Sequence, residues 1–495
     1  MNHPYGTPTS PMDKHDSSPD CQYTIYTSRE KWCIVSMVSF AAFCSTFIAN
    51  SYFPVVPILA SDFHKSIELI NLTITVYMVF QAIFLLFWGT LSDHIGRRPI
   101  YLACLLVVCL VSIGLALVPT SKYWLLLLLR CLQATGSASA IALGAGVARD
   151  VATRAERGSF IGLFSVGLLF GPAVGPIFGG VLTQVFGWRS IFWVIFLASA
   201  LCFVFLLMFL PETLRTLVGN GSILPPKIYR PLIPLIGRGR QGIVSVRAPR
   251  QPLKNPFGIF THSDVLILLL LSATLYAMFY PFVTTLSTLF QLAYPYLNEA
   301  DIGLCYLAPS SAAIIGGYVH GKTLDRSYRL LKEKWIHERE ALTGMLVRLE
   351  DITSDENFPI EIVRMKTIPI QLLVCVACCV GYGWCLQYKV NLAVPLVLQF
   401  IFGFAAIAVL NTINTLLVDL LPAQASSVIA CNYLMRYSVG AASISVIDLM
   451  IRALGTGWTY TILGAVGLSV GPMICLLMWL GPRSRAKRFA HKVQE

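Results

Sequence analysis

The stretch GTLSDHIGRRP, residues 89–99, is a short polar segment between two long apolar runs of the chain. Gly89 would allow two helices to approach closely, and Gly96 would turn the chain between them. The carboxylate of Asp93 can accept hydrogen bonds from a helix N-terminus or pair with an arginine, and the two arginines that follow can fork onto carboxylates. An ordinary loop rich in positive charge explains the arginines, but it requires neither the aspartate nor the glycines.

The composition around this stretch indicates that the solvent of the chain is lipid. The 495 residues are 56% hydrophobic and 13% charged, whereas soluble domains carry about 25% charged residues. A helix that crosses the hydrocarbon core of a bilayer needs about 20 mainly apolar residues. Twelve such runs are present, at residues 32–57, 69–90, 99–119, 122–148, 159–182, 189–210, 264–290, 301–319, 367–387, 391–418, 427–449 and 457–481. The sequence therefore predicts an all-α membrane protein with twelve transmembrane helices.

Lysine and arginine set the expected orientation of these spans. The segment 211–263 holds eight basic residues against one acid, Glu212, and the tail after residue 481 holds five against one. The segments 58–68 and 291–300, on the opposite side, hold one basic residue and none. The positive-inside rule predicts that both termini and the middle segment are cytoplasmic, against the anionic inner leaflet. Nucleic-acid binding is not expected, because the basic residues are spread over short loops.

Six spans, a basic linker and six more spans indicate two related halves. The pattern Gly-x-x-x-Asp follows the second span as Gly89 and Asp93, and it follows the eighth span as Gly321 and Asp325. A transporter built from two halves predicts this repetition. The expected parts are a tail, a first half, a linker, a second half and a final tail, at residues 1–31, 32–210, 211–263, 264–481 and 482–495.

A long charged segment, residues 320–366, interrupts the second half with nine basic and nine acidic residues. Its apolar residues fall at spacings compatible with one helix face, at Leu330, Leu331, Ile336, Leu342, Met345, Leu346 and Leu349. Two interpretations remain open. The segment is a cytoplasmic amphipathic helix against the membrane or between the halves, or it is a solvated charged linker.

The stretch GLLFGPAVGPIFGG, residues 167–180, places helix-weakening residues inside an apolar span. They are Gly167, Gly171, Pro172, Gly175, Pro176, Gly179 and Gly180. In lipid, neighbouring helices can satisfy the backbone groups that proline frees. Four glycines at steps of four form a stripe against which another span can pack. A tight helix pair explains the glycines, and the prolines in addition bend the span.

These motifs together resemble the major facilitator superfamily. The stretch 89–99 is similar to its signature loop, and the stretch 167–180 is similar to the fifth-helix motif of its drug:proton antiporters. Further similar segments are residues 130–136 with 149–150, 211–222, 52–54 and 432–436. Within the superfamily the chain looks like the fungal twelve-span antiporters, closest to the quinidine-resistance, polyamine and dityrosine exporters. The resemblance covers nearly all of residues 30–480 and implies the major facilitator fold with two six-helix halves.

The resemblance implies a proton-coupled exporter. It assigns proton coupling to Arg130 and Gln133 in the fourth span, and Arg436 lies at a similar depth in the eleventh. A charge deep in a span faces either a cavity or a partner. The alternative for Arg130 is therefore a structural role, in which backbone carbonyls are its partners. The first span carries no acid, and the remaining candidate acids lie near span ends, at Asp264, Asp419 and Asp448. Proton coupling is therefore implied by the family and not by a buried carboxylate visible in the sequence.

The resemblance also implies a cytoplasmic gate and a cavity between the halves. In the gate, Asp93 would meet the start of the eleventh span near Ser426 and Ser427, and Arg97 would pair with Asp150. The other gate candidates are Gly89, Gly96, Arg98 and Asp325. Polar and aromatic candidates for the cavity are Asn50, Tyr77, Gln81, Tyr276, Tyr280, Trp384, Asn411, Asn414 and Tyr433. Any of these rings can instead pack or face lipid, and the asparagines can instead bond neighbouring helices.

Other functions remain as alternatives. A nutrient importer or facilitator would have the same fold, and a membrane sensor could use residues 320–366 as an output element. A membrane enzyme ranks last, because the sequence presents no metal cluster and no nucleophile–base arrangement. No cofactor or metal is expected. The expected partners are a small-molecule substrate, protons and the bilayer, for a monomer in the plasma membrane of a fungus.

Overall fold

The computed structural model describes residues 24–152, 156–237, 256–343, 364–421 and 424–481. Within these ranges the chain forms helices and turns, and no β-strand. The first half contains α1 (Ser28–Asn50), η1 (Phe53–Val55), α2 (Val56–Asp62), α3 (Ile67–Ile95), α4 (Arg97–Ala116), α5 (Tyr123–Val151), α6 (Arg157–Phe186) and α7 (Arg189–Phe209). Between the halves lie α8 (Arg215–Val218), η2 (Lys227–Tyr229) and η3 (Pro256–Thr261). The second half contains α9 (Ser263–Ala293), α10 (Glu299–Cys305), α11 (Leu307–Thr343), α13 (Ile368–Gln387), α14 (Ala393–Leu420) and α15 (Ala425–Leu468).

Among the described residues, eleven helical stretches are long and apolar enough to span a membrane. The last of these stretches, Ser427–Gly481, has 55 residues. At 1.5 Å per residue it would measure about 80 Å, more than twice the bilayer core. Two helices meet inside it at a kink at Gly455, whose φ of 80° and ψ of 166° are not helical, so each part is long enough for one crossing. The expected twelve transmembrane helices are therefore present.

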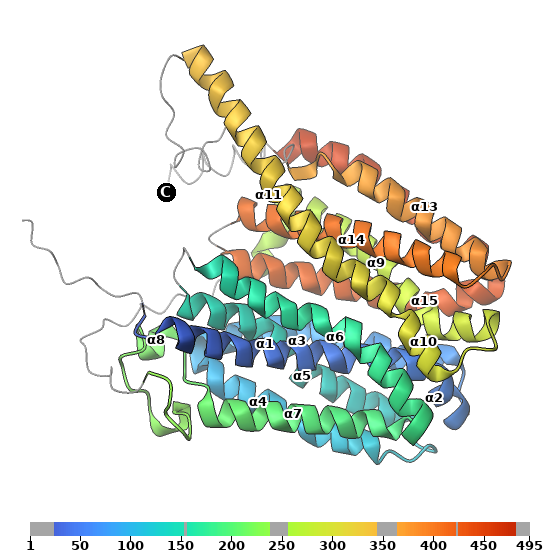
Figure 1. The fold of residues 1–495 in the computed structure, drawn as a ribbon, viewed down its shortest axis with the longest axis horizontal. Coiled ribbons are helices and arrows are strands. Elements are labelled where there is room, and N and C mark those ends of the chain that lie inside the picture. Colours follow the sequence, from blue (N-terminus) through green and yellow to red (C-terminus); the bar gives the residue numbers. More distant parts are fainter. Residues whose placement is uncertain (1–23, 153–155, 238–255, 344–363, 422–423, 482–495) are drawn as a thin grey trace, which may run out of the picture.

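The long helices run side by side and separate into two groups (Figure 1). In the first half α1 packs on α6, α3 on α5, and α4 on α7; in the second, α9 packs on α15 and α11 on α14. The halves touch mainly where α3 meets α15 and where α6 meets α10 and α11. We call the end of the bundle where α1 begins and α8 lies the linker end, and the opposite end, with α2 and α10, the far end (Figure 1).

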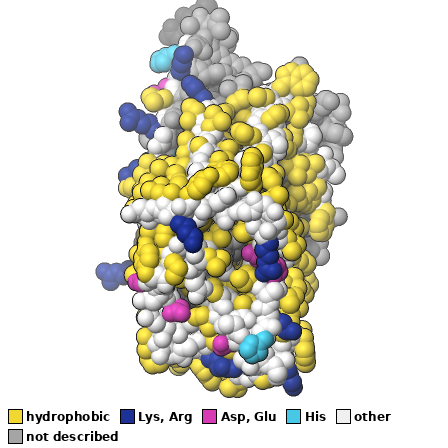
Figure 2. All heavy atoms as spheres, turned by 90° about the vertical axis from the view of Figure 1, so that its right-hand side faces the viewer, with side chains coloured by type: hydrophobic (Ala, Val, Ile, Leu, Met, Phe, Trp, Pro, Cys, Tyr) yellow, Lys and Arg dark blue, Asp and Glu magenta, His cyan; other side chains and the backbone are white. Residues whose placement is uncertain are grey.

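The surface and the core have the polarity expected of a membrane protein. Large apolar side chains are exposed along the outer helices, as at Leu197 of α7, which is 63% exposed. Buried polar side chains lie between the helices, including Arg97 and Arg130. At the far end, charged side chains are few and scattered over the visible face (Figure 2). Lipid therefore solvates the outside, and the polar groups point into the bundle.

The helix α11 differs from the expected end of the eighth span near residue 319. It continues without interruption to Thr343 and projects beyond the bundle at the linker end (Figure 1). The helical interpretation of the charged segment therefore holds as far as Thr343, as an extension of the span. The rest of the predicted helix face, at Met345, Leu346 and Leu349, lies outside the described residues.

Candidate functional site

The centre of the first half holds a buried arginine between two tyrosine rings. Arg130, in α5, is 1% exposed. Its guanidinium carbon lies 4.1 Å from the ring centroid of Tyr52 and 4.3 Å from that of Tyr77. The guanidinium donates a 2.7 Å hydrogen bond to the side-chain oxygen of Gln133, so the two residues share a face as expected. In the described part of the chain, Arg130 forms no ion pair and its Nε has no hydrogen-bond partner.

A network of hydroxyl groups fixes both rings. The hydroxyl of Tyr52 shares a 2.9 Å hydrogen bond with Thr73. The hydroxyl of Tyr77 donates a 2.8 Å bond to Ser137, which also accepts a 3.3 Å bond from Gln81. The positive charge of Arg130 thus faces two aromatic rings and one side-chain amide, and no carboxylate. Cation–π attraction is therefore the main interaction that offsets the cost of burying this charge.

The second half repeats this arrangement on α15. Arg436 is 7% exposed, and its guanidinium carbon lies 4.4 Å from the ring centroid of Tyr276 and 5.4 Å from that of Tyr433. The ring centroid of Tyr280 lies 4.6 Å from that of Tyr276, with the two rings tilted by 47°. The Nε of Arg436 also lacks a partner among the described residues. We call the two clusters the arginine centres.

Both arginine centres border the contact between the halves. A Cβ added to Gly440 of α15 would lie 3.2 Å from the Cε of Met78 in α3 and 3.3 Å from a ring carbon of Tyr276. Met78 is the neighbour of Tyr77, and Gly440 lies one helical turn after Arg436. The two buried charges therefore flank one shared surface near the middle of the bundle, where a substrate touching both halves would bind.

At the linker end, Arg97 ties three helices of the first half together. Its guanidinium contacts the carboxylates of Asp93 at 2.7 Å and Asp150 at 3.1 Å, and donates a 2.8 Å hydrogen bond to Ser92. The expected pair of Arg97 and Asp150 is therefore present. A Cβ at Gly146 would lie 2.7 Å from the guanidinium carbon, so that glycine gives the arginine its room.

Glu212 caps the N-terminus of α4 from outside that helix. Its carboxylate accepts hydrogen bonds from the amides of Arg97 at 2.9 Å and Arg98 at 3.1 Å, and also from the amides of Thr213 and Leu214. A carboxylate at this position satisfies amides that have no partner within the helix. Burial raises the pKa of the Glu212 carboxyl above its ordinary value, and the four hydrogen bonds oppose that rise.

Sequence reasoning assigned no role to Glu212, although a signal was present, since it is the only acid in residues 211–263. The turn predicted at Gly96 is confirmed, with φ of 127°. A side chain there would also collide with Glu212, since a Cβ would lie 2.7 Å from a carboxylate oxygen. Arg98 completes the corner by donating to the carbonyl oxygens of Ile228 and Leu207 at 2.9 and 2.8 Å.

One gate prediction is contradicted by the structure, and two others involve side chains that are not described. A Cβ at Gly89 would meet nothing within 4 Å, so the close helix approach expected there is wrong: this glycine faces open space. The side chains of Asp325 and Ser426 lie outside the described part of the structure. Asp93 contacts Arg97 of its own half, and its side chain is 52% exposed.

The glycine stripe of α6 packs on α1, as a tight pair requires. Four glycines face backbone or side-chain atoms of α1 and the residue that follows it, at Gly167, Gly171, Gly175 and Gly179. A Cβ at Gly171 would lie 2.6 Å from the backbone nitrogen of Phe47, closer than any side chain tolerates. Gly180 instead faces the backbone of Glu299 in α10, which belongs to the other half.

The other half satisfies one of the carbonyl groups that the prolines of α6 free. Pro176 has no amide hydrogen, so the carbonyl oxygen of Pro172 loses its partner within the helix. Ser310 of α11 donates a 2.9 Å hydrogen bond to that oxygen. The expectation that a neighbouring helix would satisfy a freed backbone group is confirmed, and here the bond joins the two halves.

In helix α9 a carbonyl group freed by proline is likewise satisfied by a serine, here within one half. Pro281 leaves the carbonyl oxygen of Ala277 without its helical partner, and Ser443 of α15 donates a 2.8 Å hydrogen bond to it. In both helices a serine hydroxyl thus satisfies a carbonyl group that proline frees, once across the halves and once within the second half.

Polar side chains join the halves near the far end. The amide of Asn71 in α3 donates to the carboxylate of Asp448 in α15, and both residues are buried. One turn farther out, Arg452 and Glu68 form an ion pair of 2.6 Å. Asp448, expected near a water interface, is therefore buried between the halves. The pairing of α3 with α15 has no local signal in the sequence.

Two further bonds extend this closure. Thr75 and Ser445 share a 3.0 Å hydrogen bond between α3 and α15. Ser287 of α9 donates a 3.0 Å bond to the carbonyl oxygen of Phe53, next to α2. The far end is thus bonded across the halves at several levels.

The candidates for the cavity divide into two sets. Those that lie in the arginine centres are Tyr77, Gln81, Tyr276, Tyr280 and Tyr433. Asn50 bonds the carbonyl oxygen of Thr46 in its own helix. Asn414 accepts a 2.7 Å bond from Asn432, which links α14 to α15, and Asn411 lies beside Gly317 of α11.

Trp384 does not belong with these residues. Its ring stacks on Tyr388 and meets Trp458 edge to face, and these two residues are 72% and 56% exposed, so the three form an aromatic cluster at the surface. Aromatic residues are enriched at both membrane interfaces. Trp384 therefore lies apart from the arginine centres, and its place in the cavity stays a prediction.

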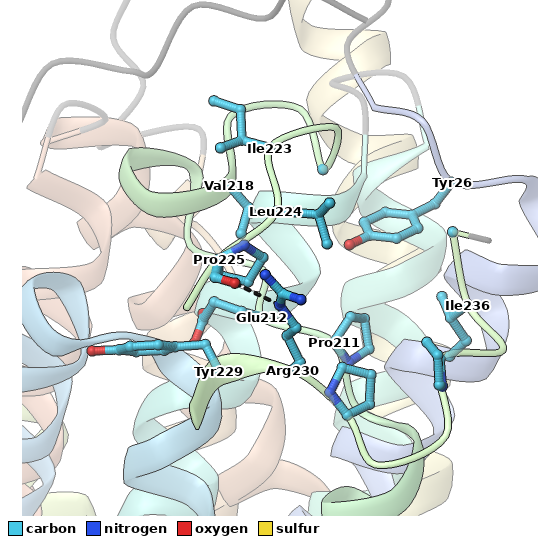
Figure 3. Close-up of a pocket in the computed structure, with 14 residues that line it drawn as sticks. Tyr26, Pro211, Glu212, Val218, Ile223, Leu224, Pro225, Tyr229, Arg230 and Ile236 are labelled. Atoms are coloured by element: carbon cyan, nitrogen blue, oxygen red, sulfur yellow. Dashed lines mark hydrogen bonds between the residues drawn. The ribbon is translucent and has the colours of Figure 1, made fainter. Parts of the chain in front are cut away.

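A cavity of about 350 Å³ lies at the linker end, away from the arginine centres (Figure 3). Tyr26 borders it from the segment before α1, and Glu212 and Arg230 border it from the linker. The side chain of Arg230 donates a 2.7 Å hydrogen bond to the carbonyl oxygen of Pro225 across the loop (Figure 3).

Comparison with known proteins accounts for this arrangement. The sequence matches the Major Facilitator Superfamily over residues 38–444. It is 32% identical to citrate exporter 1 of Aspergillus niger, over 95% of this chain and 90% of that protein. It is 34% identical to the MFS antiporter QDR2 of Candida albicans, over 90% of this chain and 88% of that protein.

Solved structures show the same fold at low identity. The human organic anion transporter MFSD10 is 16% identical and has a TM-score of 0.57, over 90% of this chain and 99% of that one. A bacterial homologue of the lysosomal transporter Spinster, in an inward-facing and unoccupied conformation, is 12% identical with a TM-score of 0.59, over 93% and 98%.

Proposed function

The chain belongs to the major facilitator superfamily and is a multi-pass membrane transporter, and from that premise we propose that it is a proton-coupled exporter of small organic molecules. The observation that carries the proposal is α6, whose glycine stripe presses on α1 while Ser310 of the other half bonds the carbonyl of Pro172. A close-packed helix at this contact suits a protein in which no leak may open while its halves rock.

The same geometry supports an alternating-access cycle. By the positive-inside rule the linker end is cytoplasmic, so the bonds at the far end close the outer side. Opening outward requires the contacts of Asn71 with Asp448 and of Glu68 with Arg452 to break. In that state Asp93, which Arg97 contacts together with Asp150, would meet the start of α15 near Ser426 and Ser427 and form the cytoplasmic gate. Asp93→Asn is expected to reach the membrane and to abolish export, and normal export by that variant would contradict the gate assignment.

Arg130 and Gln133 are the proposed coupling pair. A buried guanidinium without an acidic partner makes a second positive charge nearby unfavourable, so proton and substrate occupancy near it would influence each other. No single carboxylate is assigned as the proton carrier. The expected setting is a monomer in a fungal plasma membrane with both termini in the cytoplasm.

Transport in proteoliposomes with an imposed pH gradient tests this function. In an antiporter, protons moving down their gradient drive the substrate up its own gradient in the opposite direction, so the pH of the lumen changes in step with substrate movement. Arg130→Gln should abolish the uphill transport while downhill exchange of labelled for unlabelled substrate continues. A facilitator, the main rival, would equilibrate the substrate with no response to the gradient.

The arginine centres favour organic anions as a second candidate for the substrate class. Arg130 and Arg436 both lack an ion-paired carboxylate in the described residues, and each keeps a free Nε. A carboxylate of the substrate would supply that partner. The rings of Tyr52, Tyr77 and Tyr276 are already covered by these guanidinium groups, so they are less available to a cationic drug.

Competition separates the two substrate classes. Transport of a labelled tricarboxylate should be inhibited by other di- and tricarboxylates and reduced strongly in Arg436→Gln, with partial recovery in Arg436→Lys. Inhibition by a polyamine or a cationic drug alone, with no effect of carboxylates, would exclude the anion class and leave exporters of cations.

A further inference from the structure

Residues 223–237 form a loop that is fixed to the end of a membrane-spanning helix at the linker end. The amide of Leu232 donates a 3.3 Å hydrogen bond to the carbonyl oxygen of Leu207, and the amide of Ile233 donates a 3.0 Å bond to that of Met208. Both acceptors lie in the last turn of α7, and that turn contains only apolar side chains. The loop therefore lies at the depth where the hydrocarbon core ends.

This loop exposes large apolar side chains at that depth. Ile228 is 72% exposed, Leu232 is 65% exposed and Leu235 is 56% exposed. The adjoining helix α7 exposes Leu201 at 52% and Phe205 at 46%. Because α7 spans the membrane, its exposed side chains face lipid, and the loop continues the same apolar surface toward the headgroups. Such a surface would be unfavourable in water.

The exposed polar groups of the loop are basic. Lys227 and Arg230 are exposed, and the sequence holds no acid between residues 213 and 263. The hydrogen bond of Arg230 to Pro225 holds its guanidinium beside the loop backbone (Figure 3). Exposed apolar side chains next to lysine and arginine are typical of segments that lie in the interface of an anionic leaflet.

We propose that residues 224–235 lie within the lipid headgroup layer at the linker end, as a membrane-bound segment of the linker. Ile228, Leu232 and Leu235 insert among the upper acyl carbons, and Lys227 and Arg230 contact phosphate or carboxylate groups of anionic lipids. The occupant is lipid because the surface continues the lipid-facing side of α7 and carries the charge opposite to that of an anionic leaflet.

One residue, Arg98, connects this loop to the gate. The guanidinium of Arg98 donates to the carbonyl oxygen of Ile228 in the loop and to that of Leu207 in α7. Arg98 is the second residue of α4 and is buried next to Arg97. The lipid-bound loop therefore holds the start of α4, and with it the gate arginine, at a fixed height in the membrane.

Photocrosslinking in nanodiscs tests the contact. The full chain carries p-benzoylphenylalanine at Leu232, in discs of phosphatidylcholine and phosphatidylserine, and lipid adducts are measured by intact mass spectrometry. Leu201 in α7 is the lipid-facing reference. Glu333, on the part of α11 that projects beyond the bundle, is the aqueous reference (Figure 1). The adduct yield at Leu232 should match that at Leu201, and a yield as low as that at Glu333 overturns the proposal.

The charge of the lipid is tested in the same discs. Adducts at Leu232 should be enriched in phosphatidylserine over its share of the bilayer, and Lys227→Gln should lower that enrichment about fivefold, since one cation near an anionic surface is worth about 1 kcal/mol. Lys122→Gln at the far end is the matched control and should change nothing. Equal phosphatidylserine enrichment in Lys227→Gln and Lys122→Gln would overturn the headgroup contact. A crosslink from position 232 to a second copy of the chain would overturn lipid as the occupant.

Discussion

The two ends of the bundle use polar side chains in opposite ways. At the linker end, Arg97 and Glu212 bind partners within the first half or in the segment that directly follows it. At the far end, Asn71 and Glu68 of the first half bind partners on α15 of the second. The linker end thus maintains the shape of one half, and the far end maintains the contact between the halves. Substitutions at the two ends should therefore affect different properties, namely stability and conformation.

The largest effect is expected from Arg97→Gln at the linker end. This change leaves the carboxylate of Asp150 buried without its partner, which should lower the free energy of unfolding by about 3–5 kcal/mol. Chemical unfolding of the purified protein in detergent measures it. Adding Asp150→Asn should recover more than half of the loss. If both variants are equally unstable, the ion pair is not what stabilises this corner.

Asn71→Leu at the far end should act on conformation. The buried carboxylate of Asp448 loses its donor in the closed state, which is unfavourable by about 3 kcal/mol and corresponds to a roughly 150-fold shift toward the outward-open state. A cysteine at Thr75 should then react faster with an impermeant maleimide, as read by peptide mass spectrometry. Thr90→Val, which removes a hydroxyl bonded only within α3, is the control. Unchanged labelling in Asn71→Leu would show that this bond does not hold the far end closed.

Two serines allow a sharper version of the comparison. Ser310→Ala and Ser443→Ala each remove the donor to a carbonyl that proline has freed, and each should lower stability by about 1 kcal/mol. Only Ser310 crosses between the halves, so only Ser310→Ala should also speed the labelling at Thr75, about fivefold. Equal labelling in the two variants would mean that the bond across the halves has no conformational role.

The smallest effect concerns pH at the linker end. Because burial raises the pKa of Glu212 in the folded protein, the folded state binds this proton more tightly than the unfolded state. The contribution of Glu212 to stability should therefore fall as pH rises from the ordinary glutamate value to the raised one, and level off above it. Thermal unfolding of the wild type and Glu212→Gln across that range measures the difference. An identical pH slope in both proteins would contradict the shift.

Sequence patterns predicted the fold well because spans depend on local composition. Length and hydropathy located the twelve spans, and the glycine spacing in α6 predicted a close-packed neighbour, which is α1. The pair of Arg97 and Asp150 came from the family resemblance, and the structure contains it. The roles of Arg130, Gln133 and Arg436 in coupling stay predictions.

The contacts that the sequence missed depend on distant segments. Asn71 and Asp448 are separated by 377 positions, and nothing in either neighbourhood indicates the other. The role of Trp384 stays a prediction, because aromatic content alone does not distinguish a ring that faces a substrate from one that faces lipid. Glu212 could have been found, since a single acid in a basic segment needs a specific partner.

The uninterrupted length of α11 makes it a lever arm. The helix is bonded to the other half at Ser310 and ends 33 positions later at Thr343, about 50 Å away along its axis. Each degree of tilt about Ser310 displaces the far tip by about 0.9 Å, given a rise of 1.5 Å per residue. Rocking motions that are small at the contact between the halves therefore become large displacements beyond the bundle at the linker end. A fluorophore or a binding protein at this tip would sense the transport cycle mechanically.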